Sequence, residues 1–167
     1  MLTQINTIVK KPDLKLVKIG NELREFIKGL DHRLLGEWAK DIALRTINLF
    51  EEKYPQDDVL RKGIEALDLW LNGQMRMSEV RKVVYMAILP AARKAREEGN
   101  YAAEAAARSA GHAVATAHVP SHSLGACIYS LTAIKRNLFL KAEDYQEEIE
   151  NEYQWQIEHL KELLNRK

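Results

Sequence analysis

Three of the five histidines in this chain of 167 residues lie in one short segment, GHAVATAHVPSHSLGA, which spans residues 111–126. Imidazole binds transition metals and titrates near neutral pH. His112, His118 and His122 are therefore candidates for a metal site or for a proton-transfer centre. A third interpretation is structural, with each ring bonded to a backbone carbonyl at a helix end or to a carboxylate.

The spacing of these histidines does not match a metal site on one helix. At roughly 100° per residue, His112 and His118 lie about 120° apart around a helix, whereas ligands on one face need an i, i+4 spacing. His118 and His122 have that spacing, but Pro120 between them should end the helix. The chain contains neither a CxxC pair nor an HExxH motif, so the sequence assigns no metal and no cofactor. A metal site, a ligand pocket and a structural corner all stay open.

A second candidate feature is a charged pair one helical turn apart, Asp41 and Arg45. If the pair is exposed, it contributes only about 0.3 kcal/mol to the stability of its helix. The alternative is a buried pair that faces the histidines. The combined candidate site is then a polar cluster of Asp41, Arg45, His112, His118 and His122.

The elements that carry these residues are predicted to be helices. Glycine and proline number only 8 and 4, and apolar residues recur at helical spacing without the alternation typical of strands. At Pro90 the pattern predicts a kink, or two short helices that meet there. The predicted helices run from Pro12–Asp13 toward Leu30, from an Asp31 cap to Tyr54, from about 60 to 71, from a Ser78 cap to Gly99, from 100 to about 118, from a Ser121 or Ser123 cap to about 139, and from about 142 to 166.

The helix predicted over 100–118 is unusually poor in bulky residues. Nine residues between Ala102 and Ala117 are alanine, which favours a helix and lets neighbouring backbones come close. We therefore expect this helix in the middle of the molecule. The expected architecture is one compact all-α domain over residues 1–167, a bundle of six to seven helices that ends in an amphipathic helix at about 142–166.

Composition limits the class of protein. Hydrophobic residues make up 46% and charged residues 29%, and the formal net charge is +1, which argues against a general nucleic-acid binder. The single Cys127 cannot form an internal disulfide, as is usual for a cytosolic chain. No apolar run is long enough for a signal peptide or a membrane span. We expect a cytoplasmic protein with no membrane partner.

Three segments of the chain resemble one known family in the same order. A W-A-x-D helix, a Y-P-x-D-D turn and a G-H-A-x-A-T-A-H-V segment followed by another histidine are typical of the helical immunity proteins of bacterial polymorphic toxin systems, often called immunity-protein-five-like. The resemblance covers about residues 30–135 and leaves the segments before Asp31 and after Leu140 unassigned. The matching residues are Trp38, Ala39, Asp41, Tyr54, Pro55, Asp57, Asp58, Gly111, His112, Thr116, His118 and His122.

The resemblance implies a compact bundle that neutralises a toxin. The leading hypothesis is a non-enzymatic immunity protein that binds a protein toxin directly. An acidic recognition surface on the last helix would suit a basic nuclease toxin, because it imitates a nucleic acid. The residues of this surface are Glu147, Glu148, Glu150 and Glu152.

Two other hypotheses come from different classes of protein. The first is a small metal-binding protein or enzyme centred on the histidine cluster, with Asp41 nearby. The second is a helical scaffold that forms a homodimer through exposed aromatic residues of the last helix. These residues are Tyr145, Tyr153 and Trp155.

Overall fold

Every regular element in the described part of the chain, residues 14–141 and 143–166, is a helix in this computed structural model. The prediction of an all-α bundle is confirmed. The run α6–η1–α7 is continuous, so the described residues form eight helices rather than six to seven. None of these helices has both the length and the apolar character to cross a membrane. The elements are α2 (Leu14–Phe26), α3 (His32–Leu44), α4 (Asn48–Glu51), α5 (Val59–Leu71), α6 (Met77–Val83), the π-helix η1 (Val84–Ile88), α7 (Leu89–Glu97), α8 (Tyr101–Ala115), α9 (His122–Leu140) and α10 (Gln146–Asn165).

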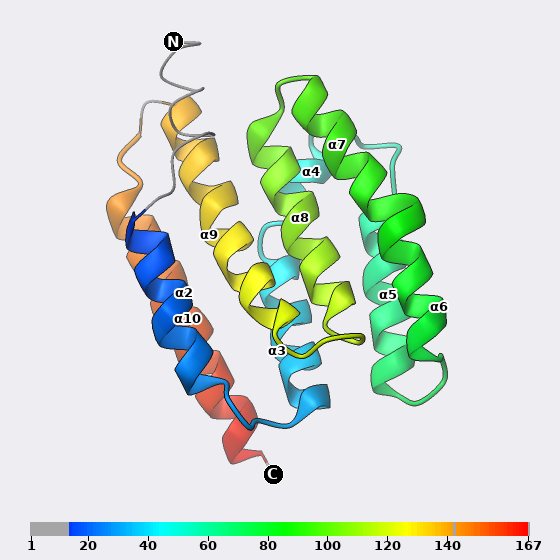
Figure 1. Ribbon diagram of the computed structural model, residues 1–167. Helices are drawn as coiled ribbons and strands as arrows, with labels where there is room; N and C mark the ends of the chain where they lie inside the picture. Colours follow the sequence, from blue (N-terminus) through cyan, green and yellow to red (C-terminus); the bar gives the residue numbers. More distant parts are fainter. Residues whose placement is uncertain (1–13, 142, 167) are drawn as a thin grey trace.

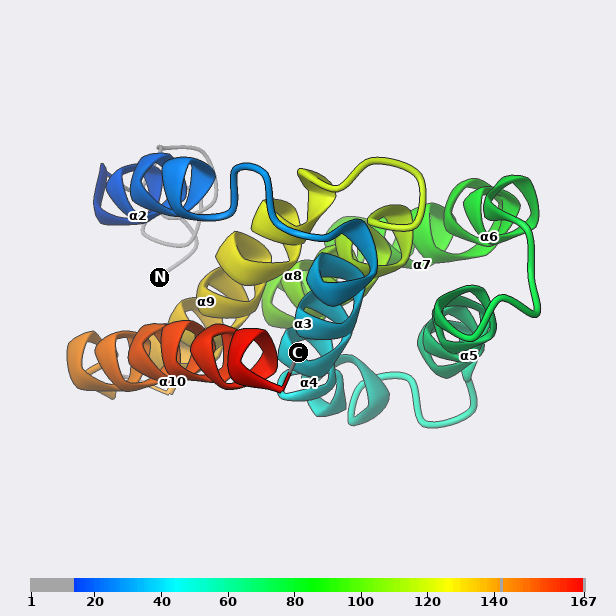
Figure 2. The same ribbon diagram turned by 90° about the horizontal axis from the view of Figure 1, so that it is seen from below.

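The alanine-rich helix α8 lies in the middle of the bundle, with α9 antiparallel beside it (Figure 1). Helices α2 and α10 lie on the α9 side, whereas α5, α6 and α7 lie on the other side of α8 (Figure 2). Helix α8 contacts α3, α4, α5, α6, α7 and α9. The central position predicted from the alanine content is therefore confirmed.

Small side chains let these neighbours approach α8. Six of its alanines are at most 1% exposed, and larger side chains from the surrounding helices fill the space around them. Gly63 of α5 and Gly111 of α8 enclose Ile88 in this way. A Cβ atom at Gly63 would lie 2.5 Å from the Ile88 Cδ1 atom, and one at Gly111 would lie 3.2 Å from its Cγ2 atom. Close packing at these two glycines places η1 directly against α8.

The irregularity expected near Pro90 is a π-helical turn rather than a break. Proline lacks an N–H group, and its ring collides with the carbonyl one turn earlier in a regular α-helix. In the structure the Leu89 N–H donates to the Val84 carbonyl, five residues back. The wider turn lets one continuous helix run from Met77 to Glu97.

Two predicted helix boundaries are wrong. The helix expected from Asp31 to Tyr54 is interrupted by a turn between α3 and α4, which brings Ile47 and Phe50 into the core at 1% exposure. Ser78 does not cap the next helix. Arg76 is the cap there, and its N–H donates to the Glu79 side chain over 3.1 Å.

Other predicted caps have different outcomes. Asp31 caps α3 as predicted, accepting a hydrogen bond from the Leu34 N–H over 2.9 Å. Ser121 precedes α9 without a side-chain cap bond. The starts expected at Pro12–Asp13 and at about Ala142 lie outside the described residues.

One buried carboxylate joins three helices. Glu104 of α8 is 1% exposed and accepts hydrogen bonds from three arginines. The donors are Arg108 Nε at 2.8 Å, Arg136 Nη1 at 3.1 Å and Arg96 Nη1 at 3.2 Å. Because these residues belong to α8, α9 and α7, the carboxylate links three helices while it neutralises only one of three guanidinium charges.

Removal of this charge should destabilise the bundle. We expect Glu104→Gln to lower the free energy of unfolding by about 3 kcal/mol, because buried Arg136 loses its counter-ion. Urea unfolding measures the loss. The matched control is Glu97→Gln on the exposed face of α7, which should change the free energy by less than about 0.5 kcal/mol. Equal effects of the two substitutions would contradict the role assigned to Glu104.

Candidate functional site

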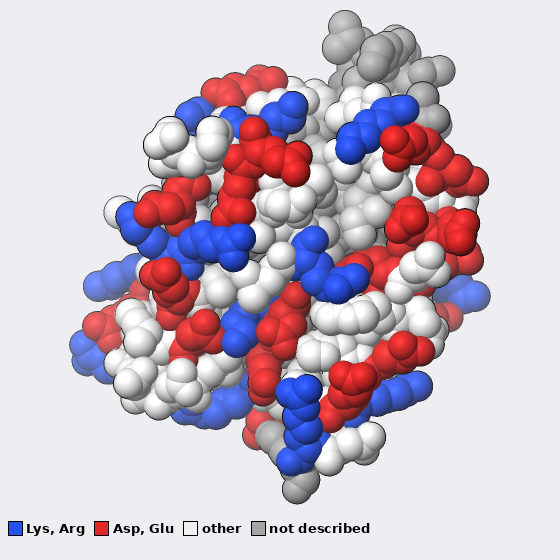
Figure 3. Space-filling view, turned by 180° about the vertical axis from the view of Figure 1, so that it is seen from behind, with Lys and Arg blue, Asp and Glu red and all other residues white. Residues whose placement is uncertain are grey.

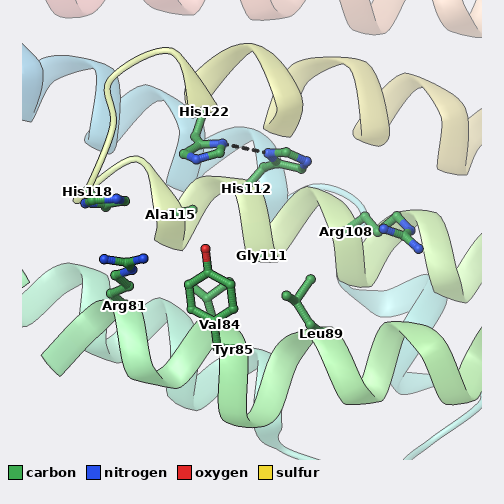
Figure 4. Close-up of a pocket in the computed structure, with 10 residues that line it drawn as sticks. All are labelled: Arg81, Val84, Tyr85, Leu89, Arg108, Gly111, His112, Ala115, His118 and His122. Carbon is green, nitrogen blue, oxygen red and sulfur yellow. Dashed lines mark hydrogen bonds between the residues drawn. The ribbon is translucent and has the colours of Figure 1, made fainter. Parts of the chain in front are cut away.

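The corner between α8 and α9 and the helix α6–η1–α7 enclose a pocket of about 120 Å³ (Figure 4). Val84, Leu89 and Ala115 provide apolar walls. All three histidines of the segment 111–126 reach this pocket. Its polar lining residues are Arg81, Tyr85, Arg108, His112, His118 and His122.

His112 and His122 form a direct pair across the corner. Their Nδ1 atoms are 3.2 Å apart, so one ring donates a hydrogen bond and the other accepts it. The turn at Pro120 reverses the chain and places the first residue of α9 opposite α8. Pro120 does separate His118 from His122 along the chain, as expected, but the imidazole pair that forms is His112 with His122.

The position of the His112 ring depends on a glycine and a tyrosine of α9. The ring stacks on Tyr129, with 5.2 Å between ring centroids and 16° between planes. A Cβ atom at Gly125 would collide with the His112 ring. The His112 ring therefore fits between α8 and α9 because residue 125 has no side chain.

Burial keeps the histidine pair neutral near pH 7. It lowers the pKa of His112 to about 4, with smaller contributions from His122 and Arg108. Burial also lowers the pKa of His122, and His118 adds to this effect. A histidine whose pKa is lowered in the folded state contributes stability at pH values above its usual pKa near 6.5. This contribution is lost as the pH falls toward the folded-state pKa.

His118 differs from the other two histidines in its partners. It lies in the turn after α8, on the side of the pocket where the Arg81 side chain lies (Figure 4). Its Nδ1 atom is buried and has no hydrogen-bond partner among the described residues. The turn beside the pocket therefore contains a buried polar atom that its described surroundings leave unsatisfied.

The histidines do not assemble a metal centre with other ligands. Within the described residues, no three histidine, cysteine, aspartate or glutamate side chains lie close enough together to hold one metal ion. Cys127 is fully buried in another part of the core, and its Sγ atom donates to Gln156 Oε1 over 2.5 Å. Burial raises the pKa of this thiol, which removes its nucleophilic form.

Asp41 and Arg45 lie elsewhere, on the side of α3 that faces α10. Asp41 bonds to His159 over 2.7 Å. Arg45 donates two hydrogen bonds to Glu152 over 2.9 and 3.0 Å. The structure therefore connects each member of the predicted i, i+4 pair to α10, and neither residue lines the histidine pocket.

Several residues of these two sites were not found from the sequence. The sequence pattern does not distinguish Arg81 or Tyr85 from other helical positions. Gly125 carried a usable signal, because a glycine inside a helical run often marks a close approach. The pairings of His159 and Glu152 of α10 gave no local signal, because their partners lie more than one hundred residues earlier in the chain. Glu152 was expected on an exposed acidic surface instead.

The ion pair between Arg45 of α3 and Glu152 of α10 predicts that the stability lost on removing Arg45 depends on pH. Burial raises the pKa of Glu152 despite the opposing bonds from Arg45 and Gln156. Ionised Glu152 therefore costs folding free energy, and this cost appears as the pH rises through its pKa. Arg45→Ala should lower the free energy of unfolding by about 1–2 kcal/mol at pH 7, since Arg45 is partly exposed. Unfolding curves should show a smaller loss as the pH falls and Glu152 becomes protonated.

The control for this prediction removes the carboxylate. In a Glu152→Gln background, Arg45→Ala should cost little and show no such pH dependence. A loss that is constant from acid to neutral pH in the original background would contradict the assignment.

Gly125→Ala should disrupt the histidine pair. The added methyl group must displace the His112 ring, so we expect a loss of about 2 kcal/mol in unfolding free energy and a rise of the His112 pKa from about 4 toward its usual value. Histidine NMR resonances followed against pH measure this change. Gly20→Ala is the control, because its Cβ atom would lie an ordinary 3.6 Å from Ile128. An unchanged His112 titration in the Gly125 variant would contradict the packing described.

Comparison with known proteins places the chain in a family. A family model described as Imm-5 like putative immunity protein matches residues 25–163. The match begins before the Asp31 cap and includes most of α10, so it extends beyond the segment 30–135 that carried the resemblance in sequence. No curated protein and no solved structure matches the chain. Because the family model covers well over half of its length, the chain belongs to the Imm-5 like putative immunity protein family.

Proposed function

We propose that this chain is an immunity protein that neutralises a protein toxin by direct contact and without catalysis. Membership in the family supports the immunity role. Neutralisation by contact requires a surface whose side chains are exposed before the partner binds. The described surface offers one such region beside the histidine pocket.

The observation that carries the proposal is the exposure of two large side chains on η1. Tyr85 is 56% exposed and Met86 is 79% exposed. Tyrosine, methionine and arginine are enriched where proteins bind one another, and tyrosine often supplies much of the binding energy. Arg81 lies one turn earlier, with its guanidinium 5.4 Å from the centroid of the Tyr85 ring. We call Arg81, Tyr85 and Met86 the η1 surface.

The acidic surface of α10 is a second candidate contact region, but it contains fewer glutamates than the sequence predicts. Glu152 does not belong to it, because this residue is 7% exposed and is paired with Arg45. Glu147, Glu148 and Glu150 remain exposed. Acidic side chains gather along the edge of the molecule where α10 lies, at the right of Figure 3. This surface would suit a basic toxin.

The two remaining hypotheses receive less support. An enzyme or metal protein centred on the histidines would need further ligands or an acid partner beside them, and the described part of the pocket lining offers no carboxylate. A homodimer through Tyr145, Tyr153 and Trp155 would need exposed rings. All three are partly buried against the core, and Trp155 lies between Arg45 and His159.

The test uses a candidate toxin chosen from the products of the genes that neighbour the gene for this chain. The purified chain should form a complex with that toxin and restore growth of cells that express it. Tyr85→Ala together with Met86→Ala should weaken binding by at least about thirtyfold, because each exposed side chain loses its contact area. Calorimetry or surface plasmon resonance gives the affinity, and light scattering gives the stoichiometry.

The matched control reverses charge on the other candidate surface, through Glu147→Lys together with Glu148→Lys. If only this control abolishes binding, α10 rather than η1 is the contact surface. If the unchanged chain neither binds the toxin nor rescues growth, the proposed function is wrong.

A further inference from the structure

The pocket beside η1 contains an excess of basic groups. Two arginines and three histidines line it, and no aspartate or glutamate belongs to its described lining. The set is one-sided in a chain whose formal net charge is only +1. A negatively charged group is what the pocket lacks.

Part of the excess positive charge comes from the arginines around Glu104. Glu104 is shared by Arg96, Arg108 and Arg136, so three positive charges have one negative partner. Arg108 contacts Glu104 through its Nε atom, while the same side chain lines the pocket. Its positive charge is therefore only partly compensated on the pocket side.

Arg81 supplies a second uncompensated charge on the opposite wall. Among the described residues it forms no hydrogen bond and no ion pair, and its guanidinium lies over the Tyr85 ring. The hydroxyl group of Tyr85 points toward α8, and the His118 ring lies close to the Arg81 side chain (Figure 4). Arg81, Tyr85 and His118 thus leave polar atoms directed toward the same space.

The size and walls of the pocket limit what would bind there. A volume of about 120 Å³ equals that of about four water molecules and suits one side chain rather than a nucleotide. Its apolar walls favour an aliphatic stem. The His118 ring lines the pocket and would bond to a polar group at the end of that stem.

We propose that this pocket binds the carboxylate of one glutamate or aspartate side chain that the toxin presents. The proposal rests on the proposed function, because the toxin is the source of the side chain. Arg81 and the neighbouring His118 ring provide positive charge and a hydrogen bond at one end of the pocket, and Arg108 adds positive charge from the other end (Figure 4). Arg81 and Tyr85 of the η1 surface line the pocket, so a partner that covers them excludes water from the contact.

Binding should be linked to proton uptake. The groups that face the pocket are Arg81 and Tyr85 from α6 and η1, Arg108 and His112 from α8, His118 from the turn, and His122 and Tyr129 from α9. Burial and like charges hold the pKa of His112 and His122 low. A bound carboxylate opposes both effects and favours the protonated rings. Affinity therefore increases as the pH falls from 7 toward 5.

Propionate is a suitable probe, because it is a carboxylate with the stem length of glutamate. Histidine NMR resonances are followed at pH 6 while propionate is added at constant ionic strength, with chloride as the reference anion. We expect His112, His118 and His122 to shift together, with tighter binding at pH 5.5 than at pH 7. Arg81→Gln should weaken binding about tenfold. Arg93→Gln, an exposed arginine of α7, should leave it unchanged.

The outcomes separate this proposal from the proposed function. Shifts with inorganic phosphate but not with propionate would overturn the carboxylate assignment, as would equal effects of Arg81→Gln and Arg93→Gln. A toxin that binds the Arg81→Gln and His118→Asn variants as tightly as the unchanged chain would overturn the pocket contact and leave the immunity function intact. The absence of any toxin complex would overturn both.

Discussion

Close approach of helices to α8 is the constraint on which the rest of the structure depends. A helix built from alanine and glycine offers little apolar area of its own, so its stability comes from the larger side chains that reach it from the neighbouring helices. Ile88 illustrates the arrangement, because it fits between Gly63 and Gly111 with no exposed surface. Each of these contacts is lost if either small residue becomes larger.

The same enclosure explains why the polar residues of α8 have defined partners. Ser109 donates to the Ala126 carbonyl over 2.8 Å, and Thr116 Oγ1 donates to the His112 carbonyl over 3.0 Å. Glu104 accepts from three arginines, and His112 pairs with His122. A polar group enclosed this tightly costs folding free energy if it has no partner. Glu104 and His112 therefore fix α8 against α7 and α9 at two separate positions along the helix.

The sequence was sufficient for the helices and for the position of α8, because both follow from local spacing and from the size of the side chains. It was not sufficient for the turn after α3. The helical signal continues through residues 45–47, and only the burial of Ile47 and Phe50 in three dimensions explains the interruption. The partners of Asp41 and Arg45 were missed for a similar reason. A local pattern suggests the neighbour one turn away, whereas α10 crosses α3 and presents His159 and Glu152 instead.

The histidine pocket shows why near-zero net charge is a weak guide to surface chemistry. A formal charge of +1 argues correctly against a broad polyanion-binding face, because such binding needs many basic groups in one area. A net charge near zero does not exclude a local separation of acidic from basic side chains. Here acidic side chains lie along α10, while arginines and histidines lie between α8 and η1. Burial keeps the histidines of the pair neutral near pH 7, so before a partner binds their rings add no positive charge that would repel the arginines. A single carboxylate from that partner would then meet the Arg81 charge beside His118, in surroundings where water screens the attraction less than at an open surface.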